Sequence, residues 1–102
     1  MRVHASDALV IAQRIGREAF LADRTMQHAV IRCLTVIGEA ANRVSTDTCN
    51  ALPEIAWAEA VALRNVLVHE HHRVDLAHVW TIVETYLPPL LDALNGYLGA
   101  ID

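Results

Sequence analysis

The fold of this chain is decided by its longest helical pattern, DRTMQHAVIRCLTVIGEAANRV, which occupies residues 23–44. Asp23 precedes the pattern as an N-terminal cap. Apolar residues then recur every three or four positions, at Met26, Val30, Cys33, Ile37, Ala41 and Val44. These 22 residues would span about 33 Å as a helix, more than the diameter of about 26 Å expected for a compact chain of this length. The pattern therefore predicts an elongated helical bundle.

The residues before this stretch predict a first helix. Ser6 and Asp7 are candidate N-caps, and the helical pattern then runs to about Phe20, with Gly16 as a point where the helix can break or bend. After the long helix, residues 45–53 form a polar connection with room for one short helical turn.

The residues after the connection predict the remaining helices. A third helix begins near residues 56–57 and ends around residues 69–72, where four polar residues interrupt the apolar pattern. Asp75 caps the last helix, which should kink at Pro88-Pro89 or restart there with Pro88 at its first position. The prediction is an all-α, elongated up-and-down bundle of four main helices, in a single domain covering residues 1–102.

Composition narrows the class of protein. The chain is 54% apolar and 20% charged, which is typical of a packed domain rather than a disordered segment. Its formal net charge is −4 and all eight basic residues are arginine, which excludes a strongly basic nucleic-acid binder. The eight arginines balance eight acidic residues within residues 1–73, whereas residues 74–102 add only acids. An anion site is therefore expected in the first three quarters of the chain.

Cysteine spacing and hydropathy indicate a cytoplasmic protein. Cys33 and Cys49 have neither metal-ligand spacing nor a disulfide framework, and Cys33 falls within the apolar stripe of the long helix. There is no signal peptide pattern and no apolar run of about 20 residues that could span a membrane. The high apolar content also predicts the oligomeric state. A domain of this size cannot bury all of its apolar surface, so apolar stripes should remain exposed on its helices and contact a partner. A homodimer is therefore expected, and the alternative is a monomer whose apolar residues fill its own core.

The chemistry of the chain concentrates in RNVLVHEHHR, residues 64–73, which holds two of the eight arginines and three of the six histidines. A helical zinc site needs a second histidine four positions after His69, and Arg73 stands there instead. No metal site and no cofactor are predicted. Glycine-rich phosphate loops and nucleophile motifs for hydrolysis are also absent from the sequence.

Metal-free cleavage of a phosphodiester fits this stretch better. His69 can move a proton near neutral pH, and the guanidinium of Arg64 can bind a phosphate with two hydrogen bonds. Residues five apart lie about 140° apart on a helix, so Arg64 and His69 share no face, whereas Asn65 and His69 do. The pair can converge only if the helix ends or loosens near His69 or if two copies of the chain face each other. The alternative is an exposed arginine and a histidine favoured by the helix C-terminus.

Several segments around the motif complete a wider pattern, which covers most of the chain from about Phe20 to Leu94. They are IGEAANR at 37–43, PEIAW at 53–57, RNVLVH at 64–69, VDL at 74–76, VW at 79–80 and LPPLL at 87–91. The combination resembles the HepT-like branch of the HEPN ribonuclease toxins, whose signature is Arg, four residues, His, any residue and Tyr.

The resemblance implies a homodimer whose motif helices meet at a composite cleft, and a metal-independent RNA endonuclease paired with an MntA-like minimal nucleotidyltransferase antitoxin. It implies that Arg64 contacts the scissile phosphate, that His69 is the general acid or base for attack by the RNA 2′-hydroxyl, and that Asn65 orients both. Supporting or RNA-binding roles then fall to Asn65, His71, His72, Arg73, Glu39 and Asn42. For Glu39 and Asn42, contact with RNA and bracing of the motif are both open.

One residue departs from the signature, because His71 stands where the family has the tyrosine that its antitoxin adenylylates. That mode of control is therefore in question, and Tyr86 and Tyr97 lie outside the motif. His71 could bind phosphate or transfer a proton, or the change could mark an inactive toxin. The alternative function is a non-catalytic helical partner that docks a minimal nucleotidyltransferase or binds nucleotides.

Overall fold

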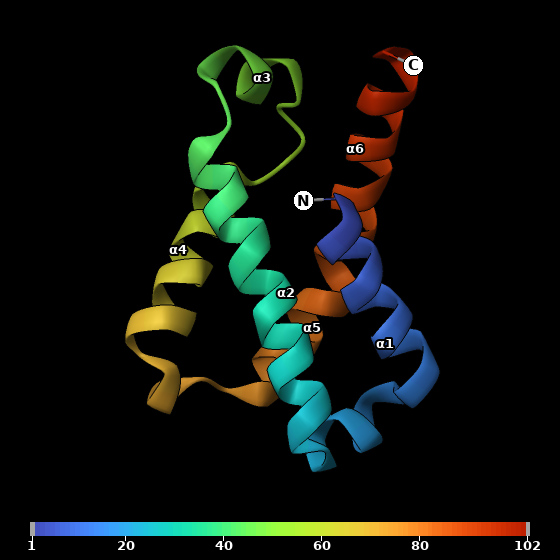
Figure 1. Cartoon of the computed structure of the whole chain (residues 1–102), viewed down its shortest axis with the longest axis vertical. Coiled ribbons are helices and arrows are strands. Elements are labelled where there is room, and N and C mark those ends of the chain that lie inside the picture. Colours follow the sequence, from blue (N-terminus) through green and yellow to red (C-terminus); the bar gives the residue numbers. More distant parts are fainter. Residues whose placement is uncertain (1, 102) are drawn as a thin grey trace.

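The computed structural model confirms an all-α fold for the part of the chain it describes, which is the backbone of residues 2–101 and the side chains of residues 2–70 and 72–97. The helices are α1 (Arg2–Ala22), α2 (Arg24–Arg43), α3 (Thr46–Ala51), α4 (Trp57–His69), the 3₁₀ turn η1 (His71–Arg73), α5 (Leu76–Thr85) and α6 (Leu87–Ile101). The molecule measures 40 × 28 × 17 Å, so the predicted elongated shape is confirmed (Figure 1). None of the helices within residues 2–101 combines the length and the apolar character that crossing a membrane requires.

Helix α1 begins earlier than predicted. It starts at Arg2, so Ser6 and Asp7 lie inside the helix and do not cap it. Ala5 and Ala8 are both fully buried, which means that the face of α1 packed on the core already includes the residues before Asp7. The predicted break at Gly16 is confirmed, since its φ of 73° and ψ of 172° interrupt α1 in a region that favours glycine.

The predicted caps of the two later helices are confirmed. The Asp23 carboxylate accepts a hydrogen bond from the backbone N–H of Met26 at 3.1 Å, which caps α2. The Asp75 carboxylate accepts from the backbone N–H of Ala77 at 3.0 Å and of His78 at 3.4 Å, which caps α5. The connection between α2 and α4 contains the short helix α3.

The predicted restart of the last helix is also confirmed, one residue earlier than expected. Helix α5 ends at Thr85 and α6 begins at Leu87, so Pro88 and Pro89 occupy its second and third positions. Proline is tolerated there because the first backbone N–H groups of any helix have no intrahelical acceptor. The change of direction allows α6 to pack on α1 (Figure 1).

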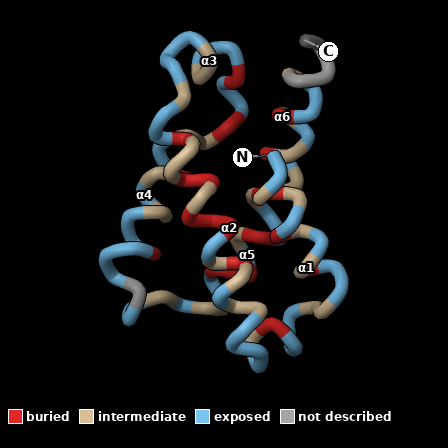
Figure 2. Tube along the Cα trace, viewed as in Figure 1, coloured by how far each residue is buried: buried red, intermediate tan, exposed pale blue. Residues whose placement is uncertain are grey.

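The core lies between α1, α2, α5 and α6 (Figure 2). Its largest fully buried side chains are Phe20, Ile37, Leu87, Val30, Val79 and Val83. The rings of Phe20 and Trp80 also pack together, with centroids 5.4 Å apart. Helix α4 packs mainly on α2 and contributes Leu67 to the core, and only its residues Ala60 and Leu67 are buried.

The two cysteines should differ in reactivity. Burial raises the pKa of the Cys33 thiol, the Asp7 carboxylate adds to this, and Arg32 partly opposes it. Because the thiolate is the reacting form, we expect iodoacetamide at pH 8 to modify the half-buried Cys49 first and Cys33 only when the protein unfolds. Peptide mass spectrometry after timed alkylation would measure this, and equal rates for both thiols in the folded protein would contradict it.

Candidate active site

Helices α2 and α4 touch at Gly38. A Cβ atom at this position would collide with the Cβ of Arg64 and would lie 2.7 Å from the backbone oxygen of Ala60. Only glycine therefore allows α4 to lie so close to α2. The close approach places the side chain of Arg64 against the next residue of α2, Glu39.

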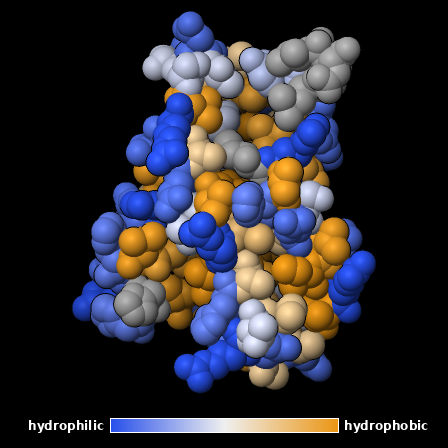
Figure 3. Space-filling model, in the orientation of Figure 1, coloured by the Kyte–Doolittle hydropathy of each residue, from blue (hydrophilic) through white to orange (hydrophobic). Residues whose placement is uncertain are grey.

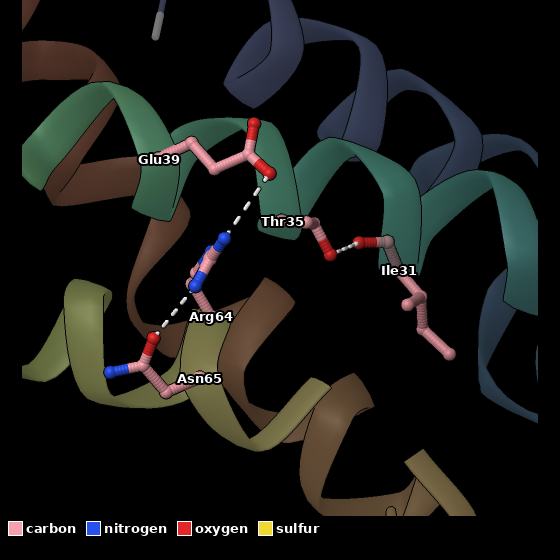
Figure 4. A network of polar contacts seen from close by, with 5 residues as sticks. All are labelled: Ile31, Thr35, Glu39, Arg64 and Asn65. Atoms are coloured by element: carbon pink, nitrogen blue, oxygen red, sulfur yellow. Dashed lines mark hydrogen bonds and ion pairs between the residues drawn. The ribbon is translucent and has the colours of Figure 1, made fainter. Parts of the chain in front are cut away.

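Two side chains hold the guanidinium of Arg64 (Figure 4). Its Nη1 donates a hydrogen bond to Oδ1 of Asn65 at 2.9 Å, and its Nη2 lies 3.8 Å from Oε1 of Glu39. Its Nε is buried and has no hydrogen-bond partner among the described residues. The guanidinium is therefore fixed in position while several of its N–H donors are unused, which suits a residue that binds an anion.

A polar pocket of about 230 Å³ opens beside this guanidinium. It is lined by Glu39, Asn42, Arg43, Val61, Arg64 and Asn65. The structure thus brings together four of the residues predicted for the site, from two helices that are distant in sequence. Arg43 was not among the predicted residues, although its place one helical turn after Glu39 could have indicated it.

His69 lies apart from Arg64. It is exposed at the last position of α4, which stays helical up to this residue, and the backbone N–H of Glu70 still donates to the oxygen of Val66 at 2.9 Å. No hydrogen bond or ion pair joins Arg64 to His69 in the described part of the chain. The helix ends at His69, as the interrupted apolar pattern predicted, but this ending does not join the two side chains within one chain.

The opposite flank of α4 borders an apolar groove of about 480 Å³. Its lining comes from α4, α5 and the residue that follows α5: Glu59, Ala60, Ala62, Leu63, Val66, His78, Ile82 and Tyr86. Val66 and Val68 are 38% and 39% exposed, and apolar surface is visible over α4 in Figure 3. Burial, together with the Glu59 carboxylate, raises the pKa of Tyr86, whose hydroxyl donates to the backbone oxygen of Ala56 at 3.4 Å.

Comparison with known proteins assigns the family. The family model described as "Ribonuclease HepT-like" matches residues 1–96. The chain belongs to the HepT-like ribonuclease family. It is 40% identical to the protein named "Probable ribonuclease HepT" of Thermococcus cleftensis, in an alignment covering 83% of this chain and 81% of that one. It is 33% identical to the protein named "Putative RNase MJ1380" of Methanocaldococcus jannaschii, with 84% and 79% covered. No solved structure matches the chain.

The remaining predicted site residues of this member of the HepT-like ribonuclease family follow α4. His72 and Arg73 lie on η1 and do not line the polar pocket between α2 and α4. Nη1 of Arg73 is 3.8 Å from Oε1 of Glu70, with both side chains largely exposed. The side chain of His71, at the tyrosine position of the HepT-like signature, lies outside the described residues. Among the described side chains, no three His, Cys, Asp or Glu groups come together as a metal site would require.

Proposed function

We propose that this HepT-like ribonuclease is a metal-independent RNA endonuclease that acts as a homodimer, with Arg64 of one protomer and His69 of the other at each site. The observation that carries the proposal is the divergence of the two side chains on one unbroken helix. Arg64 faces α2, and His69 is exposed about 140° around the helix. A single chain supplies half of the site, so a second copy is needed to complete it.

The apolar groove supports the dimer. Ala62 and Val66 line it on α4, Ile82 lines it on α5, and Val66 is exposed in the single chain. A second copy placed over this flank of α4 would bury apolar surface that is otherwise in contact with water. In the proposed dimer, the partner's His69 would have to reach across α4 from this flank to Arg64.

The proposed reaction uses one cation and one proton-transfer group. Arg64 binds the scissile phosphate and stabilises the charge that builds on it. His69 takes the proton of the ribose 2′-hydroxyl, the 2′-oxygen bonds to phosphorus, and the bond from phosphorus to the 5′-oxygen breaks. The 5′-oxygen takes up a proton, so the products are a 2′,3′-cyclic phosphate and a 5′-hydroxyl. Asn65 positions Arg64 through their hydrogen bond.

The biological setting that fits this activity is a toxin paired with a minimal nucleotidyltransferase antitoxin in the cytoplasm. His71 offers no phenol, and the Tyr86 hydroxyl already donates a hydrogen bond within the chain. We therefore propose that the antitoxin controls this protein by binding it and not by adenylylating the motif tyrosine. The second candidate, a non-catalytic partner of a nucleotidyltransferase, is favoured by the same histidine.

Incubation of the protein with single-stranded RNA should test the reaction. We expect cleavage to persist in EDTA and to leave a 2′,3′-cyclic phosphate. A substrate with a 2′-deoxy nucleotide at the cleavage position should not be cleaved there, because the attacking 2′-hydroxyl is missing. Mass spectrometry of the products would identify the ends. Loss of cleavage in EDTA would contradict the metal-independent mechanism, and absence of cleavage with tight binding to a nucleotidyltransferase would select the non-catalytic function.

A further inference from the structure

We propose that Arg43 binds a second RNA phosphate, next to the phosphate bound by Arg64, and that the polar pocket between α2 and α4 is a substrate subsite. The inference rests on the proposed ribonuclease function, which assigns phosphate binding to Arg64. Arg43 lines the same pocket of about 230 Å³ and ends α2.

The charges around the pocket favour an anion. Its lining contains two arginines and one carboxylate, that of Glu39, which lies 3.8 Å from Arg64. Arg43 takes part in no ion pair with the described side chains. An unpaired guanidinium at a polar concavity is therefore present in a protein whose net charge is −4. Local charge of this kind can bind a phosphate despite the opposing net charge.

The position of Arg43 fits the course of an RNA strand. Helices α2 and α4 run antiparallel and touch at Gly38 (Figure 1). Arg43 is five residues beyond Gly38, about 7.5 Å further along the axis of α2. His69 is displaced from Arg64 in the opposite direction, so Arg64 lies between the two. A strand whose scissile phosphate is at Arg64 would continue past the amides of Asn42 and Asn65 to place its next phosphate at Arg43.

A comparison of three arginine variants tests the subsite. Arg43→Ala should raise KM for an RNA oligonucleotide about 10-fold with kcat nearly unchanged, because a charged hydrogen bond away from the scissile bond is lost. Arg43→Lys keeps the charge and should recover part of the loss. Arg24→Ala is the matched control, since it removes an exposed arginine from the other end of α2, about 28 Å away. Circular dichroism would confirm that all three variants are folded.

Binding of an all-2′-deoxy oligonucleotide separates this inference from the proposed function, because that strand cannot be cleaved. Fluorescence anisotropy over a range of salt concentrations should give weaker binding for Arg43→Ala and a log–log salt slope shallower by about 0.7, as expected for one lost phosphate contact. Equal affinities and slopes for wild type, Arg43→Ala and Arg24→Ala would overturn the subsite, as would no binding by wild type. If the wild-type protein binds the strand with the expected dependence on Arg43 but does not cleave RNA, the proposed ribonuclease activity is wrong and phosphate binding by Arg43 is not.

Discussion

Alanine in place of Arg64 or of His69 is expected to lower the rate of RNA cleavage by about 10³-fold. Loss of Arg64 removes the cation that stabilises the charge on the phosphate, and loss of His69 removes the group that takes the proton of the 2′-hydroxyl. Initial rates on a labelled RNA oligonucleotide would measure both effects. The Arg24→Ala variant is the control, because it removes an arginine remote from the polar pocket.

Mixing the R64A and H69A variants tests whether Arg64 and His69 of one site come from the same protomer or from two different protomers. If Arg64 and His69 come from different protomers, a dimer of one R64A and one H69A chain keeps one intact site. Co-refolded equal amounts should then recover about one quarter of the wild-type activity, since half of the dimers are mixed and each has one of two sites. No recovery would contradict the shared site.

A second mixture gives the matching control. Equal amounts of wild type and the double variant R64A/H69A should give about one quarter of full activity if the site is shared, because the mixed dimers are then inactive. If both residues act within one chain, the mixture should retain about half. Compared with a site within one chain, a shared site therefore gives higher activity in the first mixture and lower activity in the second.

Alanine in place of Gly38 is expected to destabilise the protein by about 1–3 kcal/mol, although alanine normally favours a helix by about 1 kcal/mol over glycine. The added methyl would collide with the Cβ of Arg64 and push α4 away from α2. We also expect RNA cleavage to fall, because the guanidinium of Arg64 would move away from Glu39. Urea denaturation and cleavage rates would measure the two effects.

The control for Gly38 is Gly96, which lies on α6. A Cβ atom there would meet no atom within 4 Å, so Gly96→Ala should leave activity unchanged and stabilise the fold by at most about 1 kcal/mol. A Gly38→Ala variant as stable as Gly96→Ala would show that α2 and α4 are not in close contact.

Much of the fold could be predicted from the sequence because its helix boundaries depend on local chemistry. Asp23 and Asp75 cap helices, Gly16 interrupts one, and Pro88 lies in the first turn of another, and each effect involves only neighbouring residues. The start of α1 could not be predicted in the same way. Its early residues Ala5 and Ala8 are buried by packing on other helices, which no local signal in the sequence indicates, so the polar pair Ser6 and Asp7 led to a start that is too late.

The candidate site was predictable in part for the same reason. The spacing of Arg64 and His69 predicted that they would diverge on a continuous helix, and the structure keeps that helix continuous. The polar pocket depends instead on contact between α2 and α4, and the spacing of residues within a single helix does not predict that contact. Glu39 and Asn42 were predicted from the resemblance, whereas Arg43 was identified as a pocket residue from the packing of the two helices.

The restart at Leu87 turns α6 back along α1, so the first turn of α1 and the last turns of α6 lie on the far side of α2 from α4 (Figure 1). Attachment of the chain to a sensor surface, or of a fluorophore, through either of these helices would therefore leave the motif helix uncovered. A protein attached through α1 and a protein attached through α6 should therefore both expose α4 to dissolved RNA.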